Sequence, residues 1–401
     1  MKKLLSLMLC IGAAAPLMSA APTLVDLAKK AKTTDEARNY INQALEDPQL
    51  NQQAETYFVA GKIEFDAFDN GYKAKLTNPE DPAGSVDVLG PELLLGYQYF
   101  MKALPLDSVP NEKGQVKPKY SKDIMGRIKG HSADIFTAAA DYYNEQKYYP
   151  EAYNLFIIYG DLPVVLNDPT VVTPEMVATS YFNAGLAAYQ GQNSEAAAEG
   201  FKKARLADYE QPEATIYEIA SWQTIAQNDE SRSQEAEAKI KDAAKFGYEK
   251  FGIDQPIFII NYINSMVNEG QMDQAVEELN EIIAQHPDSA NLYGLMGFVY
   301  DRMENDELSE ANYRKAASLP TVDFETLKNS STKLFKVGTE KLSALEGNSD
   351  ETNAARQDIK NNYFQVALDY ANRANEMQPG DPKVQSLLDS IDYALTTYFK
   401  Y

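Results

Sequence analysis

The sequence predicts an all-α protein built from repeated pairs of antiparallel helices. Apolar residues recur at spacings of three and four, which is the period of one face of a helix. Turn signals follow one another at intervals of about 15 to 20 residues, which suits helices of about four turns. The phrase YFNAGLAAY at 181–189 has a near copy, YFVAGKIEF, at 57–65. A recurring phrase in a helical chain indicates a repeat architecture.

The first 20 residues have the features of a secretory signal peptide. A basic start is followed by an apolar run over 4–17 and by small residues at 19–21. We therefore expect cleavage near Ala20 and an exported protein in the periplasm or associated with the cell envelope. Cys10 follows Leu9 rather than a small residue, which argues against a lipid anchor. Because this is the only cysteine, the mature chain is expected to lack disulfides and thiolate metal sites.

Four windows of 34 residues, starting at 133, 178, 256 and 290, share one pattern of small and bulky residues. The last two windows abut. In each window the first helix has bulky and small residues three and four apart, and the second has small and bulky residues at the same spacing. In window order, the residues of the first helix are Phe136, Ala139, Ala140 and Tyr143; Tyr181, Ala184, Gly185 and Ala188; Ile259, Tyr262, Ile263 and Met266; and Tyr293, Met296, Gly297 and Tyr300.

This pattern resembles the tetratricopeptide repeat (TPR), in which a small residue on the first helix lets the second helix approach closely. The resemblance implies a right-handed superhelical solenoid of antiparallel helix pairs. It also implies about seven to eight repeats and a C-terminal capping helix.

The spacing of the repeats predicts the organisation of the chain. Gly61 and Gly96 are placed as the paired small residues of one repeat but are separated by far more than the usual interval, so we predict an inserted loop over 66–91. The predicted segments are a signal peptide (1–20), degenerate N-terminal repeats that contain the inserted loop (21–118), a main array (119–323), an expanded final repeat (324–381) and a capping helix (382–401). A proline-rich stretch at 105–120 is expected to be a loop or hinge.

Composition and motifs argue against several functions. The formal net charge is −22, and no basic stripe is present, which argues against nucleic-acid binding. No later apolar run approaches the roughly 20 residues of a membrane span. The two histidines, His131 and His286, are expected in exposed turns, and no catalytic, metal or cofactor motif is present. In the tyrosine-rich stretch 142–153, Tyr143 is expected in the core, which leaves Tyr142 and Tyr148 for a ligand. We therefore expect a non-enzymatic protein without a cofactor.

The resemblance implies that the first helices line a concave face that binds a protein or an extended peptide. The leading hypothesis is a TPR scaffold for protein interactions in the bacterial cell envelope, with a partner and an oligomeric state that the sequence leaves open. Aromatic, aliphatic and amide side chains on this face suit a partly apolar or basic segment. The candidate partner-binding residues are Phe58, Lys62, Phe65, Phe182, Leu186, Tyr189, Ile260, Asn264, Phe298, Asp301 and Arg302.

Two alternatives remain open. The first is a glycan-binding helical component of an outer-membrane nutrient uptake system, although such proteins are normally lipid-anchored and carry longer insertions. The second is an α/α-toroid hydrolase, although toroids usually need longer units of irregular length than the two abutting windows. Glycan binding would favour the first alternative, and glycan turnover would favour the second.

Overall fold

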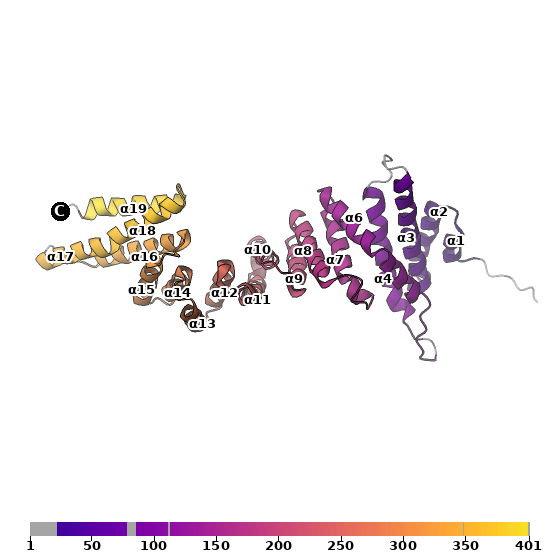
Figure 1. Cartoon of the computed structure of the whole chain (residues 1–401), viewed down its shortest axis with the longest axis horizontal. Coiled ribbons are helices and arrows are strands. Elements are labelled where there is room, and N and C mark those ends of the chain that lie inside the picture. Colours follow the sequence, from indigo (N-terminus) through magenta and orange to yellow (C-terminus); the bar gives the residue numbers. More distant parts are fainter. Residues whose placement is uncertain (1–21, 78–85, 111–112, 348, 400–401) are drawn as a thin grey trace, which may run out of the picture. The chain divides into compact units, whose positions relative to one another are not determined.

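The computed structural model describes residues 22–77, 86–110, 113–347 and 349–399 (Figure 1). Within these ranges the regular elements are helices and no β-strand is present, which confirms the all-α class. The predicted signal peptide, 1–20, lies outside the described residues. The chain divides into two compact units, residues 1–196 and 197–401, and each is described by itself.

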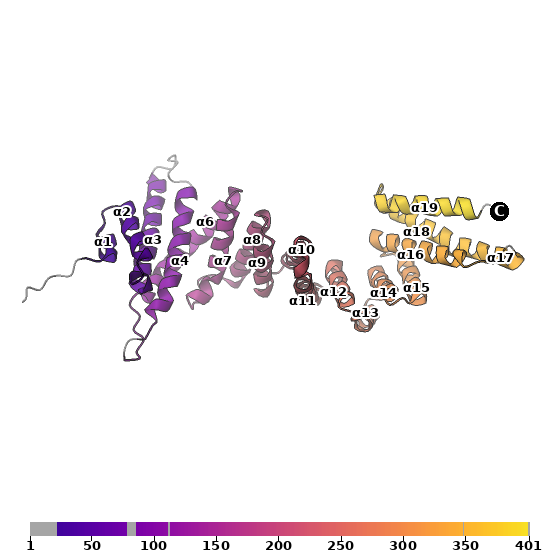
Figure 2. The same ribbon diagram turned by 180° about the vertical axis from the view of Figure 1, so that it is seen from behind.

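The first unit consists of paired helices and one extra helix, α5. Its elements are α1 (Leu24–Lys30), α2 (Thr34–Glu46), the 3₁₀ turn η1 (Leu50–Gln52), α3 (Ala54–Thr77), α4 (Val86–Asp107), α5 (Ser121–Gly130), α6 (Ser132–Asn144), α7 (Tyr149–Val165) and α8 (Pro174–Gln190). Figure 2 shows α3 and α4 side by side as a long antiparallel pair. A continuous apolar core runs from this pair through α6 and α7 to α8.

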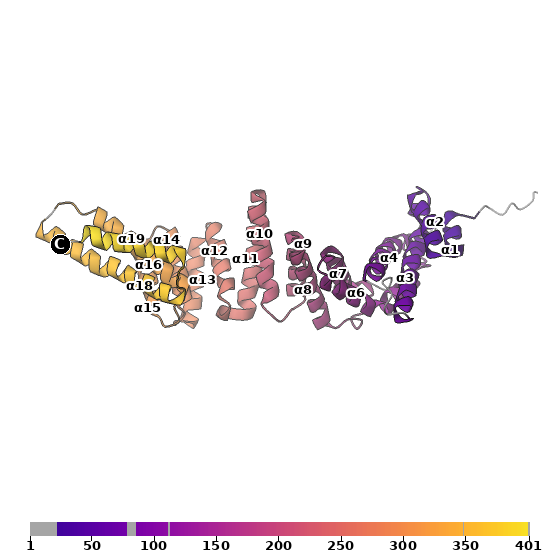
Figure 3. The ribbon, with the colours of Figure 1, turned by 90° about the horizontal axis from the view of Figure 1, so that it is seen from above.

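The second unit continues with shorter pairs and ends in longer helices. The division between the units falls within α9 (Ser194–Leu206). The elements that follow are α10 (Glu213–Asn228), η3 (Glu230–Arg232), α11 (Ser233–Phe251), η4 (Gly252–Asp254), α12 (Pro256–Asn268), α13 (Met272–Gln285), α14 (Ala290–Arg302), α15 (Asp306–Ser318), α16 (Phe324–Ser343), α17 (Asp350–Ile359), the π-helical turn η5 (Lys360–Phe364), α18 (Gln365–Met377) and α19 (Pro382–Tyr398). Figure 3 shows α16, α18 and α19 running along one another.

The turn between the two helices of a pair is the same in four places. One residue just after the first helix adopts a left-handed backbone, with φ between 55° and 75°. These residues are Gln146, Gln192, Gly270 and Glu304. In the windows that start at 178, 256 and 290, this residue always falls at the same position, which fixes the phase of the repeat.

The same turn corrects the window that was placed at 133. Gln146 matches the others only if that window starts at 132. Burial agrees, because Ile135, Ala138, Ala139 and Tyr142 are the buried residues of α6, whereas Tyr143 is half-buried. Alanine-rich helices fit the pattern in more than one phase, which explains the error. Tyr142 is therefore a core residue, contrary to the prediction.

The predicted loop over 66–91 is also wrong over most of its length. Helix α3 continues to Thr77 and helix α4 begins at Val86, and residues 78–85 between them lie outside the described residues. The additional residues therefore lengthen both helices instead of forming a loop. Phe65 and Phe68 of α3 share one apolar cluster with Leu93 and Tyr97 of α4, which stabilises the longer pair. In the proline-rich stretch, residues 105–107 belong to α4, and the described residues 108–110 and 113–120 lie between α4 and α5.

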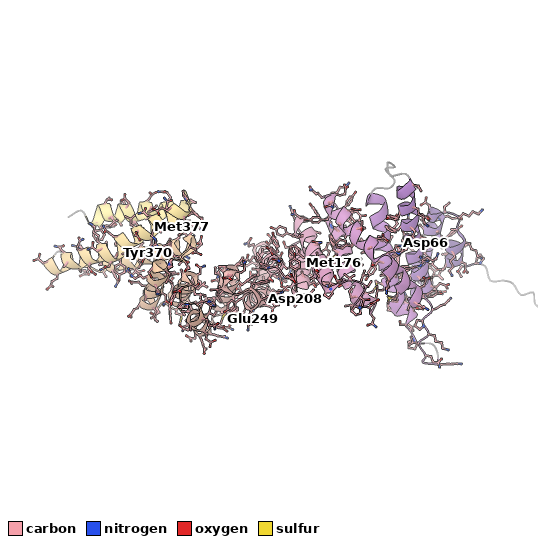
Figure 4. The ribbon with its side chains drawn as sticks, viewed as in Figure 1. Asp66, Met176, Asp208, Glu249, Tyr370 and Met377 are labelled. Atoms are coloured by element: carbon pink, nitrogen blue, oxygen red, sulfur yellow. The ribbon has the colours of Figure 1, made fainter. Side chains whose placement is uncertain are left out.

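Over 324–399 the structure gives the long helix α16, the continuous run α17, η5 and α18, and the last helix α19. The side chain of Tyr370, near the middle of α18 (Figure 4), is buried among apolar residues of this region. Nowhere in the described ranges does a helix combine the length and the apolarity that crossing a membrane requires.

Candidate functional site

A groove of about 860 Å³ lies in the second unit between α16 and α19. The turn η5 contributes to its floor, and α17 contributes to its rim. Helix α16 contributes Phe335, Thr339, Leu342 and Ser343; α17 and η5 contribute Arg356 and Phe364; and α19 contributes Ser386, Asp389, Ser390, Tyr393, Ala394, Thr397 and Tyr398. Residues on both walls recur at spacings of three and four, so each helix presents one face to the groove.

Small hydroxyl side chains give the groove its width. Most of them donate their proton to a carbonyl one turn earlier in their own helix. Thr339 donates to the carbonyl of Phe335 at 2.8 Å, and Ser343 donates to that of Thr339 at 2.8 Å. On the opposite wall Ser390 donates to the carbonyl of Ser386 at 2.7 Å. These bonds leave the hydroxyl oxygens available to accept hydrogen bonds, but they use the donors.

The floor of the groove is aromatic. Phe364 is almost fully buried, and its ring meets that of Phe335 edge to face, with centroids 5.6 Å apart. Phe364 ends the π-helical turn, which shifts the helical register between α17 and α18. This turn therefore lets α17 and α18 run on as one element while Phe364 points at α16.

The rim of the groove carries exposed tyrosines and two charges. Tyr393 is 63% exposed and Tyr398 is 51% exposed, which is uncommon for such large side chains. Arg356 already donates to the carbonyl of Gly347 at 2.9 Å and to Asn353 at 3.2 Å. Asp389 accepts one hydrogen bond from the amide of Gln385 at 3.2 Å. The partners of both groups are neutral, so the guanidinium of Arg356 and the carboxylate of Asp389 both keep their charge at the rim.

The neighbouring seam between first helices, α14 against α16, is closed by polar contacts. Thr326 of α16 donates to Asn291 Oδ1 of α14 at 3.2 Å. Lys333, only 4% exposed, lies between Asp301 at 2.5 Å and Asp306 at 2.6 Å. The groove occupies the corresponding seam between α16 and α19, where the long α17, η5 and α18 segment takes the place of a standard second helix.

Of the three residues of α3 that were predicted to bind a partner, one prediction is wrong. Phe65 is fully buried, because its ring fills the space left by the missing side chain of Gly96 on α4. A Cβ at Gly96 would lie 2.5 Å from that ring, and a Cβ at Gly61 would lie 2.4 Å from the ring of Phe100. Each helix thus presents a glycine to a phenylalanine of the other helix, and this contact buries Phe65 where a ligand cannot reach it.

The other two predicted residues of α3 do lie on a surface. Phe58 and Lys62 line a smaller pocket of about 430 Å³ with α1 and α2. The ring of Phe58 stacks on Tyr120 at 4.6 Å, and Lys62 pairs with Asp66 at 2.7 Å. Asp66, labelled in Figure 4, also accepts from Arg127 at 3.1 Å. These partners hold the helices of the first unit together.

The predicted residues of α8 share one face of that helix. Phe182 and Leu186 are half-buried, and Tyr189 is 48% exposed. The packing residues of the same phrase, Tyr181, Ala184, Gly185 and Ala188, are buried, as predicted. The phrase therefore separates packing from surface residues along one helix.

In the second unit the five residues predicted to bind a partner differ in their surroundings. Ile260 and Phe298 are half-buried and pack against the core of α10 to α14, and Asn264 is half-buried. Arg302 is exposed. The prediction that Asp301 binds a partner is wrong, because its carboxylate binds the buried Lys333 and so fixes α16 to α14. None of these residues lines the groove between α16 and α19.

His131 was expected in an exposed turn and is instead half-buried between helices. Its Nδ1 lies 2.8 Å from the carbonyl oxygen of Arg127 and its Nε2 lies 3.1 Å from Asp69. Its ring meets Phe65 edge to face at 4.9 Å. His286 is exposed, as predicted. Among the described residues no three His, Cys, Asp or Glu side chains come close enough to hold a metal ion.

Sequence reasoning missed the groove residues because it compared every window with the standard repeat. A signal for them exists in the last helix. Along 386–398 the exposed positions hold serine, threonine, tyrosine and two aspartates at helical spacing, and Ile391 and Ala394 face the core. Capping requires only a polar outer face, so the tyrosines that recur among the polar residues of this terminal helix are the signal.

No protein-family model and no curated protein sequence matches the chain. Three solved structures are similar in fold. A TPR repeats protein from Bacteroides fragilis is 16% identical over 67% of this chain and 97% of its own, with a TM-score of 0.32. The TPR domain of P58(IPK) is 12% identical over 94% of this chain and 99% of its own, with a TM-score of 0.27. The APC/C hetero-tetramer Cut9-Hcn1 is 14% identical over 92% of this chain and 74% of its own, with a TM-score of 0.29.

The assignment follows from the chain itself, in which α12, α14 and α16 begin 34 residues apart, small residues lie between the helices of a pair and the same left-handed turn occurs in four places. The protein is a helical repeat protein with a tetratricopeptide-like fold.

Proposed function

We propose that this protein is a non-enzymatic scaffold that binds a segment of a partner protein in the groove between α16 and α19. The observation that supports it is the groove itself, an aromatic floor between two walls of small side chains at the end of a repeat array. Repeat arrays recognise partners on continuous surfaces of this kind. Exposed Tyr393 and Tyr398 at its rim add the residue type that dominates binding energy in many interfaces.

The chemistry of the groove favours binding over catalysis. Thr339, Ser343 and Ser390 donate their protons to carbonyl groups of their own helices, so no base activates these hydroxyls as nucleophiles. The charged groups Arg356 and Asp389 are held by amide and carbonyl groups. This arrangement can accept hydrogen bonds and bury apolar groups.

The proposed setting is the bacterial cell envelope. The support is the basic and apolar start of the sequence over 1–20, followed by small residues. Fractionation of the native cells, with mass spectrometry of the mature N-terminus, tests this setting. A protein that retained residues 1–20 in the cytoplasm would contradict it.

Site-specific photocrosslinking in the native cells tests the binding role. A photoreactive amino acid at Ser390 or Ser343 is expected to capture a defined partner segment, which mass spectrometry then identifies. The matched control is Thr332, which is equally exposed on α16 but does not line the groove. Crosslinks at all three positions alike, or at none, would contradict the proposal.

One observation favours a glycan as the second candidate ligand. Exposed tyrosine rings beside several hydroxyl groups could stack on a sugar ring and hydrogen-bond to it. Titration of the purified chain with a panel of glycans, followed by Tyr393→Ala, separates this candidate from a protein ligand. Turnover of any glycan in the same panel would instead favour a hydrolase.

A further inference from the structure

We infer that the segment bound between α16 and α19 is a basic amphipathic α-helix; this inference rests on the proposed function of the groove. The groove would hold the helix along α19, from Ser386 to Tyr398. That stretch of α19 is about 18 Å long, or between three and four helical turns. Three properties of the walls select a helix of this kind.

The first property is the state of the backbone groups. Both walls are helices, whose N–H and C=O groups are bonded within each helix, so the groove offers no strand edge. An extended peptide would cover several of its own backbone donors and acceptors without partners, at a cost for each. The hydroxyl protons of Thr339, Ser343 and Ser390 are already donated. A helix satisfies its own backbone and needs only side-chain packing.

The second property is the size of the wall residues. Helices pack with their axes 8–10 Å apart when small side chains lie at the contact. Along α19 the groove positions hold Ser386, Ser390, Ala394 and Thr397, and α16 presents Thr339 and Ser343. The floor of Phe335 and Phe364 then receives the apolar side chains of the incoming helix.

The third property is continuity with the array. At the preceding seam, α16 contacts α14 directly through Thr326 and Lys333. At the next seam α16 and α19 also approach each other, but the groove lies between the faces that line it. A bound helix would extend the packing of helix on helix that already builds this unit.

Charge sets the sign of the ligand. The lining of the groove carries one charge of each sign, Arg356 and Asp389, and each is bonded only to neutral groups, so the charge of the chain around the groove decides the sign of the ligand. The whole chain carries a formal net charge of −22. A helix with lysine or arginine on its polar face complements both Asp389 and this field, and an acidic helix would be repelled.

Designed peptides of about 18 residues, long enough to be helical, test the inference. The probe has leucines on one face and lysines on the other. Its three relatives have a central proline, a scrambled order, or glutamate in place of lysine. Fluorescence anisotropy against the full chain is expected to show binding of the probe at least about tenfold tighter than that of each relative. Equal binding of the proline peptide would overturn a helical ligand, and tighter binding of the glutamate peptide would overturn a basic one.

Matched variants locate the binding. Ser390→Trp fills the groove and is expected to weaken the probe about tenfold or more, whereas Thr332→Trp, two turns before Thr339 on α16 and outside the groove lining, leaves it unchanged. Asp389→Asn is expected to weaken it several-fold more than Asp392→Asn, which removes the same charge from the same helix outside the groove. Equal losses within either pair would overturn the inference.

Failure of this inference can be distinguished from failure of the proposed function. Groove-specific crosslinks to a partner segment, together with failure of the helical probe, would overturn only the helical ligand. Absence of groove-specific crosslinks would overturn the proposed function itself. Sedimentation of the full chain and of Ser390→Trp covers a third outcome, because a dimer lost only in that variant would replace the partner helix by a second copy of this chain.

Discussion

The ring of Tyr181 lies directly against Gly160. A Cβ atom at Gly160 of α7 would come within 2.4 Å of Cε1 of that ring. The hydroxyl of Tyr181 donates to Asp161 at 2.6 Å, so the ring is held at both ends. Burial, together with this bond to a carboxylate, raises the pKa of Tyr181. The tyrosine that opens the repeated phrase is thus the contact that joins α8 to α7.

Gly160→Ala is expected to lower the free energy of unfolding by about 1–3 kcal/mol, because the ring cannot move without losing its bond to Asp161. Denaturant unfolding of the full chain measures the change. The control is Gly126→Ala in α5, where no atom lies within 4 Å of the added Cβ. There alanine is expected to be neutral or stabilising by up to about 1 kcal/mol. Equal losses at both positions would contradict the contact.

Gln192→Gly is expected to raise the free energy of unfolding by about 0.5–1 kcal/mol, because Gln192 has a φ of 58°, which glycine adopts without strain. Gly270 occupies the same position of another repeat, with a φ of 75°, and Gly270→Ala should destabilise that repeat. Thermal and denaturant unfolding measure both variants. Gln190→Gly, two residues earlier and within α8, is the control and should destabilise. A gain at Gln190 as well would show that the turn is not the cause.

Arg205→Met is expected to lower the free energy of unfolding by about 3–5 kcal/mol, because it leaves Glu218 buried without its charge partner. Arg205 and Glu218 are 4% and 2% exposed, and Nε donates to the carboxylate at 2.7 Å. The double variant Arg205→Met with Glu218→Met should recover much of the loss. Lys203→Met, a surface cation of the same helix, is the control for a change of charge.

The same variant should be more stable in acid than at neutral pH. Burial raises the pKa of Glu218 even with Arg205 present, and loss of the cation raises it further. A group whose pKa is raised by folding contributes stability below its unfolded pKa and loses it as the pH rises through the folded pKa. Unfolding of Arg205→Met between pH 4 and 8 should therefore show stability falling as the pH rises, relative to the parent chain. Parallel profiles for the two proteins would contradict the burial of an unpaired carboxylate.

Asp107 is expected to release the start of α5 in acid. Its carboxylate accepts from the backbone N–H groups of Lys119, Tyr120 and Ser121 at 2.8–2.9 Å and from the hydroxyl of Ser121 at 2.7 Å. Burial raises the pKa of Asp107, but the bonds from Ser121 and the three amides outweigh it, so the pKa lies below its usual value of 3.8. The stabilisation is therefore present above pH 4 and lost as the pH falls through the folded pKa.

Amide NMR resonances of Tyr120 and Ser121, followed from pH 6 to pH 2, measure this release. They should move together, with a midpoint below pH 3.8. Asp107→Asn should show the released positions already at neutral pH, because an amide cannot accept as strongly. Unchanged resonances in that variant would show that the carboxylate does not hold α5.

Particular residues show how far sequence reasoning reached. The small residues Ala184, Gly185 and Gly297 were correctly predicted as packing residues, because their spacing reflects close contact between neighbouring helices of the chain. The pairing of Gly61 and Gly96 was predicted correctly, but most of the predicted loop between them was wrong. Extra residues between two matched positions leave the same spacing whether they form a loop or lengthen two helices. The prediction that Phe65 lies on the binding face, as the counterpart of Tyr189, was wrong because its helix packs against α4 on that side.

The groove escaped prediction for a related reason. Ser386, Ser390 and Tyr393 are unremarkable one by one, and their meaning depends on α16, which lies more than 40 residues away in the chain and is brought alongside by the long α17, η5 and α18 segment. Asp301 shows the reverse, because a residue predicted to meet a ligand was already bound to Lys333 from the next repeat.

The sequence by itself determined the helices, their pairing along the chain and the small residues between them, because these follow from contacts within about 34 residues and leave a periodic pattern. The tertiary structure alone decided which faces stay open. Whether a face stays open depends on how each helix packs against the next repeat. Lys333 closes the contact between α14 and α16, and Phe364 forms the floor of the groove between α16 and α19. Both contacts join residues that are far apart in the sequence, so the local spacing of residues does not reveal them.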